Sequence, residues 1–132
     1  MEKPLALIVE DNPQLNQIFC LTLQDDFEIL SVSDGGSALR VLGQQVPAIL
    51  ILDLNLPEVS GEGVLDYVRS EERLAATRVI LATADSVKAD ELAHAADLVL
   101  LKPISPSQLK ILAGRIIKRM TQPLTMPRGG RI

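Results

Sequence analysis

The feature that most constrains the fold of this chain is an alternation of short aliphatic runs with segments of helical periodicity. Three of the runs are continuously apolar, as expected of parallel strands that are buried on both faces of a sheet. The five predicted strands are Leu5–Val9, Phe27–Val32, Ala48–Leu52, Arg78–Ala82 and Leu98–Leu101. Strand–helix alternation repeated five times predicts right-handed crossovers, and therefore an α/β fold with a five-stranded parallel sheet that is doubly wound, (βα)5.

Apolar residues at helical spacing occupy the segments that follow these runs. This helical pattern is weakest in the segment after the fourth run. Asn12-Pro13 and Ser105-Pro106 each supply an N-cap followed by a first-turn proline, at the start of the first and last helices. The positions that mark the five helices are Leu15, Ile18, Phe19 and Leu23; Ala38, Leu39 and Leu42; Val64, Leu65 and Val68; Leu92, Ala95 and Ala96; and Leu109, Leu112, Ala113, Ile116 and Ile117. We therefore expect one helix after each strand.

The chain has the size and the apolar content of one domain. It has 132 residues, of which 47% are hydrophobic and only 2% aromatic, so an aliphatic core is expected. Proline, glycine and arginine dominate from Thr121 onward. We expect a single domain at residues 1–119 and a disordered tail at residues 120–132.

Composition also bears on location and partners. Cys20 is the only cysteine, which excludes an internal disulfide and fits the reducing cytosol. No apolar run approaches the ~18 residues of a membrane span. Residues 98–132 carry seven basic and no acidic residues, but no aromatic stacking residue or DNA-binding motif accompanies them. We expect a cytoplasmic protein that contacts neither a membrane nor, within this chain, a nucleic acid.

Polar side chains follow the predicted strands at their carboxyl ends, which is where an open parallel sheet binds its ligands. They are Glu10 and Asp11 after the first strand, Asp53 and Asn55 after the third, Thr83 after the fourth and Lys102 after the fifth. Taken singly, each has an ordinary structural explanation, such as a helix N-terminus, a turn or a strand end. Together, in this order, they predict one shared site.

The chemistry of this set favours phosphoryl transfer. Crowded carboxylates repel one another unless a cation neutralises them, and oxygen ligands without thiol or imidazole favour Mg²⁺ or a similar ion. Lys102 adds a positive charge and Thr83 a hydroxyl donor, which leaves Asp53 as the candidate nucleophile. No base accompanies a serine or cysteine, and His94, the only histidine, is expected to be exposed.

In these residues the chain resembles the receiver domain of two-component response regulators. The resemblance covers about residues 4–119 and rests on Glu10-Asp11, Leu52–Pro57, Gly61, Thr83-Ala84 and Lys102-Pro103. It implies a flavodoxin-like strand order of 2-1-3-4-5 and the phospho-accepting chemistry of the family. The chain would then be a stand-alone regulator or a receiver domain excised from a longer one.

The resemblance implies a role for each residue in phosphorylation. Asp53 would accept a phosphoryl group from a phosphohistidine on a histidine kinase or a histidine phosphotransfer protein. Thr83 and Lys102 would contact the phosphoryl oxygens, with a cis peptide bond before Pro103 directing Lys102 inward. The domain would catalyse its own phosphorylation and dephosphorylation, and the phosphorylated state would alter the binding of an unknown downstream protein or of a second copy in a homodimer.

A divalent metal, Mg²⁺ or Mn²⁺, is implied at the same site. Asp11, Asp53 and the backbone carbonyl of Asn55 would bind it directly, and Glu10 mainly through water. Glu10 stands where the family more often has aspartate, but a longer acid still reaches a metal-bound water. We therefore expect the site to function.

Further departures from the family pattern concern the surface that normally transmits the signal. Val99 stands three residues before the lysine, where the family commonly has tyrosine or phenylalanine. Thr83 and Lys102 are 19 positions apart, which is shorter than the family spacing, and no glycine precedes the fifth strand. We expect a short or displaced fourth helix and an atypical output face.

Two other functions compete with a phosphorylated module. The altered output face would suit a degenerate receiver that acts as a constitutive protein-interaction module, although such a module has no need of Asp53, Thr83 and Lys102. A phosphatase of the haloacid dehalogenase type uses a similar set of residues. It needs a second aspartate where Asn55 stands, however, and its nucleophile lies on the first strand. We expect the receiver chemistry to be retained.

Overall fold

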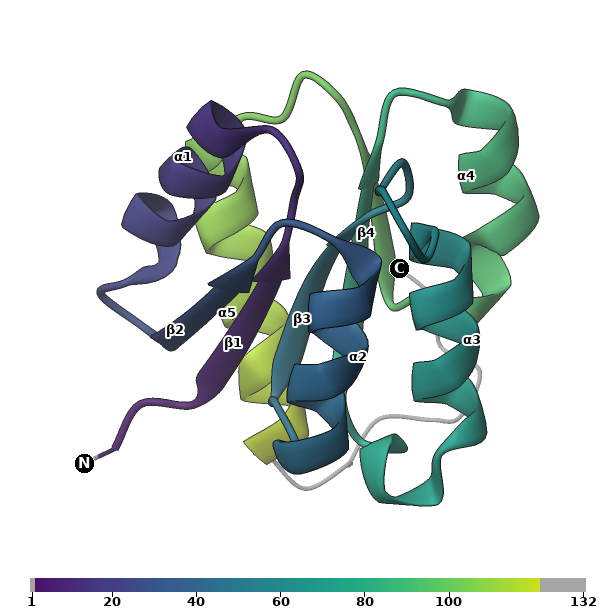
Figure 1. The fold of residues 1–132 in the computed structure, drawn as a ribbon. Helices are drawn as coiled ribbons and strands as arrows, with labels where there is room; N and C mark the ends of the chain where they lie inside the picture. Colours follow the sequence, from purple (N-terminus) through teal and green to yellow (C-terminus); the bar gives the residue numbers. More distant parts are fainter. Residues whose placement is uncertain (1, 122–132) are drawn as a thin grey trace.

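The sheet has five parallel strands in the order β2-β1-β3-β4-β5 in the computed structural model, which describes residues 2–121. The strands are β1 (Leu5–Val9), β2 (Glu28–Val32), β3 (Ile49–Asp53), β4 (Arg78–Thr83) and β5 (Leu98–Leu101) (Figure 1). The predicted α/β class and strand order are confirmed. The third and fourth strands each run one residue further than predicted, so that Asp53 and Thr83 are the last residues of β3 and β4.

One α-helix follows each strand, and a polar side chain caps the start of every one. The helices are α1 (Pro13–Leu23), α2 (Gly35–Gln44), α3 (Gly61–Ser70), α4 (Ser86–Leu92) and α5 (Pro106–Thr121), with 3₁₀ turns η1 (Glu72–Leu74) and η2 (Ala93–Ala95). The caps are Asn12, Asp34, Ser60, Asp85 and Ser105, each of which accepts a hydrogen bond from a backbone N–H of the first turn. Such caps satisfy amide groups that the helix itself leaves unpaired, and they stop the chain from extending the helix backward.

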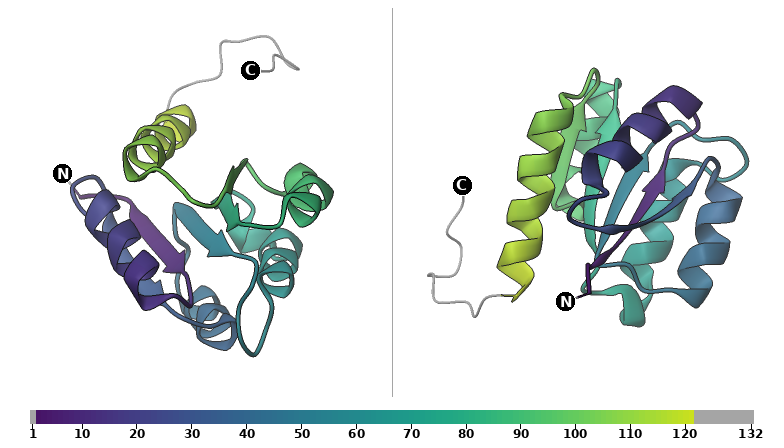
Figure 2. Two further views of the ribbon diagram at one scale, coloured as in Figure 1. Left: turned by 90° about the horizontal axis from the view of Figure 1, so that it is seen from above. Right: turned by 90° about the vertical axis from the view of Figure 1, so that its left-hand side faces the viewer.

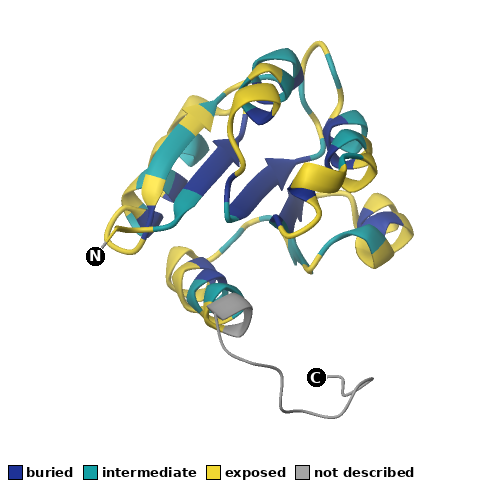
Figure 3. Cartoon of the chain, turned by 90° about the horizontal axis from the view of Figure 1, so that it is seen from below, coloured by how far each residue is buried: buried dark blue, intermediate teal, exposed yellow. Residues whose placement is uncertain are grey.

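Helices cover both faces of the sheet, as the continuously apolar strands require. On one face, apolar residues of the strands pack with α1 and α5, around Phe19 and Leu109. On the other face they pack with α2, α3 and α4, around Leu42 and Leu65. Figure 2 shows these two helical layers with the sheet between them. The central strands are buried and the edge strand β2 is partly exposed (Figure 3). The core therefore holds the carboxyl ends of β1, β3 and β4 in fixed positions.

The fourth helix is short, as the sequence predicted. It has seven residues and continues as the 3₁₀ turn η2, so Ala95 lies in that turn and Ala96 beyond it, rather than in one longer helix. His94 lies in the same turn and is exposed, as expected. The connection between β4 and β5 is too short to hold another turn of α-helix. This is why α4 ends at Leu92 and does not extend through Ala95 and Ala96.

Asp97 anchors the start of β5. Its Oδ2 accepts hydrogen bonds from the backbone N–H of Val79 at 2.7 Å and from Nη2 of Arg69 at 3.2 Å, and its Oδ1 lies 3.2 Å from Nη1 of Arg78. Arg69 also donates to the backbone carbonyl of Ala95 at 2.7 Å. This polar network fixes the connection between α4 and β5, where the sequence has no glycine before the strand.

The end of the chain is described only as far as the end of α5. That helix runs to Thr121. The rest of the tail predicted at residues 120–132, from residue 122 onward, lies outside the described residues. None of the helices within residues 2–121 is long and apolar enough to cross a membrane.

Candidate functional site

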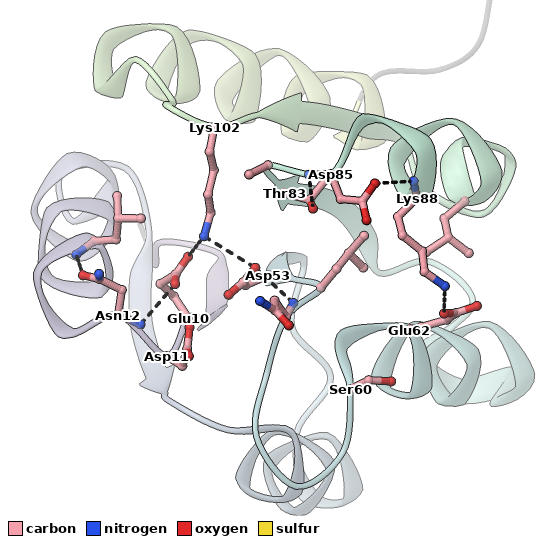
Figure 4. Close-up of a pocket in the computed structure, with 15 residues that line it drawn as sticks. Glu10, Asp11, Asn12, Asp53, Ser60, Glu62, Thr83, Asp85, Lys88 and Lys102 are labelled. Atoms are coloured by element: carbon pink, nitrogen blue, oxygen red, sulfur yellow. Dashed lines mark hydrogen bonds and ion pairs between the residues drawn. The ribbon is translucent and has the colours of Figure 1, made fainter.

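The carboxyl ends of four strands bring the predicted residues to one edge of the sheet. Asp53 and Thr83 end β3 and β4, Glu10 directly follows β1, and Lys102 directly follows β5. They line a cavity of about 750 Å³, together with Asp11 and Asn55. Figure 4 shows the side chains of Glu10, Asp53 and Lys102 directed toward one another from different elements. All six residues singled out in the sequence therefore meet in one place.

Three carboxylates form the acidic centre of this cavity. Glu10, Asp11 and Asp53 each offer an oxygen, and these oxygens lie within 4.8 Å of one another. Glu10 is 1% exposed and Asp53 is 3% exposed, whereas Asp11 faces solvent. Two of the three carboxylates are thus removed from water. In the protein interior their mutual repulsion is screened less than it would be in solvent.

Lys102 is the cation that faces this group. Its Nζ lies 3.0 Å from Oε1 of Glu10 and 3.5 Å from Oδ1 of Asp53. Burial lowers the pKa of Lys102, but the contact of its ammonium with the Glu10 carboxylate and the charge of Asp53 outweigh burial and raise the pKa above its usual value. The peptide bond between Lys102 and Pro103 is cis, as the resemblance implied.

One lysine does not neutralise three carboxylates, and Asp53 shows the imbalance. The pKa of Asp53 is raised from 3.8 to about 6, mainly by burial and also by the charge of Glu10. The backbone N–H of Asn55 and the charge of Lys102 act in the opposite direction but do not compensate. A carboxyl group in this position is poised to take up a proton or to gain from an added cation.

Both oxygens of Glu10 are engaged within the protein. Oε1 contacts Lys102, and Oε2 accepts a hydrogen bond from the backbone N–H of Asn12 at 3.1 Å. The Nδ2 of Asn16 donates to the backbone carbonyl of Glu10 at 3.0 Å and to that of Val32 at 3.1 Å. These contacts fix the loop that follows β1, and they hold the Glu10 carboxylate in one orientation.

The loops after β3 and β4 orient the remaining residues. The backbone N–H of Asn55 donates to Oδ1 of Asp53 at 3.2 Å, and the Oγ1 of Thr83 accepts from the backbone N–H of Asp85 at 3.0 Å. The Oδ1 of Asp85 in turn accepts from the amides of Val87 and Lys88, at 3.0 Å each. Thr83 is therefore connected to the start of α4 through one residue.

Gly61 lets the loop after β3 return close to the strand. A Cβ at this position would lie 2.2 Å from the carbonyl oxygen of Asp53 and 2.4 Å from the Cα of Leu54, and both of these are backbone atoms. The N–H of Gly61 also donates to the carbonyl of Leu54 at 3.0 Å. A side chain at this position would displace the end of β3, so glycine is required for the position of Asp53.

Two residues at the mouth of the cavity were not singled out in the sequence. Glu62 on α3 and Lys88 on α4 line the same cavity as Asp53, and their Oε1 and Nζ lie 3.0 Å apart. Figure 4 shows the pair on the opposite side of Asp53 from Glu10. The only sequence signal was that each lies in the first turn of a helix that follows a site strand.

The donor set fits a hard divalent cation. The acidic centre consists of carboxylate oxygens with no thiol or imidazole among them, and it carries more negative charge than Lys102 offsets. Oxygen-only sites of this kind suit Mg²⁺ or Mn²⁺. With a buried aspartate, a lysine and a threonine around one cavity, the arrangement can stabilise a phosphoryl group on Asp53.

Comparisons with known proteins agree with this arrangement. The family model for the response regulator receiver domain matches residues 6–113. A signal receiver domain from Vibrio parahaemolyticus superimposes with a TM-score of 0.81 at 34% identity, over 89% of this chain and 92% of that one. The receiver domain of the sensor histidine kinase PA1611 from Pseudomonas aeruginosa gives a TM-score of 0.79 at 25% identity, over 88% and 98% of the two chains, and has a magnesium ion in its active site cleft.

Curated relatives are longer than this chain. The transcriptional regulatory protein GltR of Pseudomonas aeruginosa is 32% identical over 130 residues, which are 96% of this chain and 53% of GltR. The sensor histidine kinase TmoS of Ectopseudomonas mendocina is 29% identical over 119 residues, which are 88% of this chain and 12% of the kinase. The chain thus spans about half or less of the length of these relatives.

Proposed function

Because this chain belongs to the response regulator receiver domain family, we propose that it is the phospho-accepting module of a two-component phosphorelay, with Asp53 as the acceptor. The observation that carries this proposal is the environment of Asp53. Its carboxylate is buried at the end of β3, near two other carboxylates and 3.5 Å from the ammonium of Lys102. Such a group is a nucleophile held in place, with a cation beside it to receive phosphoryl oxygens.

Mg²⁺, or Mn²⁺ in its place, is the cofactor of this proposal. Asp11, Asp53 and the backbone carbonyl of Asn55 would hold the metal directly. Glu10 would contribute through water, since Lys102 and the Asn12 amide already occupy its two oxygens. When bound, the metal supplies the positive charge that the three carboxylates and the phosphoryl oxygens require.

The proposed step is an in-line displacement at phosphorus. An oxygen of the Asp53 carboxylate attacks the phosphorus of a phosphohistidine, so that a P–O bond forms while the P–N bond breaks. The electron pair of that bond leaves with the imidazole nitrogen of the donor, which takes a proton from solvent. Dephosphorylation follows when water attacks the same phosphorus and releases inorganic phosphate, which restores the carboxylate.

Lys102 and Thr83 have different tasks in this step. Lys102 donates hydrogen bonds to a phosphoryl oxygen, and its raised pKa keeps the ammonium charged across the physiological range. Thr83 is 3% exposed, and its hydroxyl hydrogen is free to donate to another phosphoryl oxygen while Oγ1 still accepts from Asp85. The two residues place donors at the carboxyl ends of β4 and β5, which lie on the other side of β3 from β1.

The partners follow from the chemistry of the donor. We propose that a histidine kinase or a histidine phosphotransfer protein supplies the phosphoryl group in the cytoplasm, and that the phosphorylated state alters the binding of a downstream protein. A homodimer is a candidate for the phosphorylated assembly. The half-buried thiol of Cys20 fits a reducing compartment.

A small donor with a P–N bond tests the proposal without the natural kinase. Phosphoramidate with Mg²⁺ should produce a phosphorylated chain, seen by ³¹P NMR as an acyl phosphate, and EDTA should prevent it. A chromogenic phosphate ester should not be turned over, because the site lacks the second aspartate that a phosphatase of the haloacid dehalogenase type requires at Asn55. Steady turnover of the ester would contradict the receiver function and support a phosphatase function.

A constitutive interaction module is the second candidate, and Val99 is the observation that favours it. Val99 is partly buried and packs against the core that lies under α2, α3 and α4, in the position where an aromatic side chain would turn inward. A module of this kind would bind its partner equally well with and without phosphorylation. Equal affinity of the wild type and of Asp53→Asn for a captured partner, with and without phosphoramidate, would favour it.

A further inference from the structure

An ion pair joins α3 to α4 at the mouth of the phosphoryl site. The Nζ of Lys88 lies 3.0 Å from Oε1 of Glu62, and both side chains line the cavity that contains Asp53 and Lys102. The two side chains are 46% and 43% exposed. Exposed pairs of this kind contribute little to stability, so a stronger anion can displace one partner at small cost.

The start of α4 is also connected to the site through its cap. The amide of Asp85 donates to Oγ1 of Thr83, and the carboxylate of Asp85 accepts from the amides of Val87 and Lys88. Lys88 is thus tied to the site by its backbone, through Asp85, and by its side chain, which lines the cavity. A change at Thr83 can therefore reach the first turn of α4 through Asp85.

The other end of the same segment is held more firmly. Arg69 donates to the carbonyl of Ala95 at 2.7 Å and to Asp97 at 3.2 Å, and Asp97 accepts from the backbone N–H of Val79 at 2.7 Å. The segment formed by α4 and η2 is thus anchored to α3 and β4 at the end far from the site. At the site end, its side-chain contact with α3 is the exposed pair between Lys88 and Glu62.

We propose that Lys88 is a phosphoryl-responsive positioning residue, which exchanges Glu62 for the phosphoryl group on Asp53 and thereby moves the first turn of α4. This inference rests on the proposed function. It gives the chain a way to change its output face although Val99 replaces the usual aromatic residue.

Charge and burial favour the exchange. A phosphoryl group carries more negative charge than the Glu62 carboxylate and presents three acceptor oxygens. It would sit on a residue that is 3% exposed, whereas the Glu62 side chain is 43% exposed, so water screens the attraction of Lys88 to Glu62 more. The ammonium of Lys88 therefore has more to gain inside the cavity than at its mouth.

Beryllofluoride, a stable mimic of the phosphoryl group, tests the exchange in the whole chain with Mg²⁺. A ¹H–¹⁵N NMR titration follows binding at the amides of Asp53 and Ala84, and it follows the helix at the amides of residues 87–92. The wild type should bind the probe and shift the amides of α4. Substitutions of the two residues of the ion pair should change the affinity for beryllofluoride in opposite directions.

In Lys88→Gln, we expect the affinity for beryllofluoride to fall by about two- to fivefold, as for loss of one partly exposed charge contact. The shifts of α4 should disappear in this variant even at saturation. In Glu62→Gln, affinity should rise by about two- to fivefold, because no carboxylate competes for Lys88. The control Lys110→Gln removes an equally exposed lysine, which pairs with Asp25 away from the site, and should leave both readouts unchanged.

The outcomes separate this inference from the function beneath it. Absence of binding to the wild type would overturn the proposed function, and the exchange with it. Binding with affinities that change in the same direction in both variants would overturn only the exchange, since a plain structural clamp behaves in that way. Movement of α4 that persists in Lys88→Gln would overturn it as well.

Discussion

The Nζ of Lys102 lies 3.0 Å from Oε1 of Glu10. This contact is shorter than the 3.5 Å contact that the same ammonium makes with Asp53. The lysine is thus shared between two carboxylates and lies nearer to Glu10 than to the proposed acceptor. The charge balance among these three groups determines how the site binds cations and protons.

Removal of the Glu10 charge should relax the site. In Glu10→Gln, we expect the pKa of Asp53 to fall below its wild-type value of about 6, because the charge of Glu10 is one of the causes that raise it. Mg²⁺ affinity should weaken by about tenfold, as for loss of an outer-shell partner. Carbon-detected NMR of the Asp53 carboxyl group measures the first, and a Mg²⁺ titration the second. Asp25→Asn, an exposed change away from the site, serves as the control.

Asp53 should make the stability of the metal-free protein depend on pH. Its pKa is 3.8 in an ordinary environment and about 6 in the folded chain, so folding takes up a proton between these values. The stabilising contribution is complete below the lower value and is lost as the pH rises through the higher one. In EDTA, Asp53→Asn should therefore melt above the wild type at pH 7.5, and the difference should shrink as the pH falls through 6 toward 4. A constant difference would contradict this account.

Gly61 should tolerate no side chain. In Gly61→Ala, the new Cβ would meet backbone atoms at the end of β3, so we expect a loss of about 2–4 kcal/mol in the free energy of unfolding. Phosphorylation should fall as well, since Asp53 would move. The matched control is Gly114→Ala in α5, where nothing lies within 4 Å and the helix should gain up to about 1 kcal/mol. Denaturant unfolding of both variants checks the opposite signs.

Asp97 should contribute to the stability of the fold through the hydrogen bonds that its carboxylate accepts at the start of β5. Asp97→Ala leaves the backbone N–H of Val79 without its acceptor and removes one of the acceptors of the Arg69 guanidinium, and we expect a loss of about 2 kcal/mol in the free energy of unfolding. Hydrogen exchange should rise at the start of β5. Asp97→Asn keeps one acceptor oxygen and should lose less. Equal and negligible effects of both changes would show that the network contributes nothing.

Most of the site could be predicted from the sequence because of a geometric rule. The carboxyl ends of parallel strands meet at one edge, so polar residues that follow continuously apolar runs must come together there. This rule placed Glu10, Asp53, Thr83 and Lys102 in one cavity, which the structure contains. The short fourth helix was likewise predictable from the spacing between Thr83 and Lys102.

Contacts between helices could not be predicted in this way. The pairing of Lys88 with Glu62 depends on how α3 and α4 are rotated against the sheet, and neither residue stands out by its type or spacing. The engagement of both Glu10 oxygens within the protein and the network around Asp97 depend similarly on side-chain directions. Such details require the packed structure, since many arrangements share the same apolar pattern.

Intact mass measured after incubation with acetyl phosphate and Mg²⁺, for the wild type and for Asp53→Asn, tests the central claim most directly. We predict that the wild type gains one phosphoryl group, that EDTA prevents the gain, and that Asp53→Asn gains none. No gain by the wild type, or an equal gain by Asp53→Asn, would contradict the assignment of Asp53 as the phospho-acceptor.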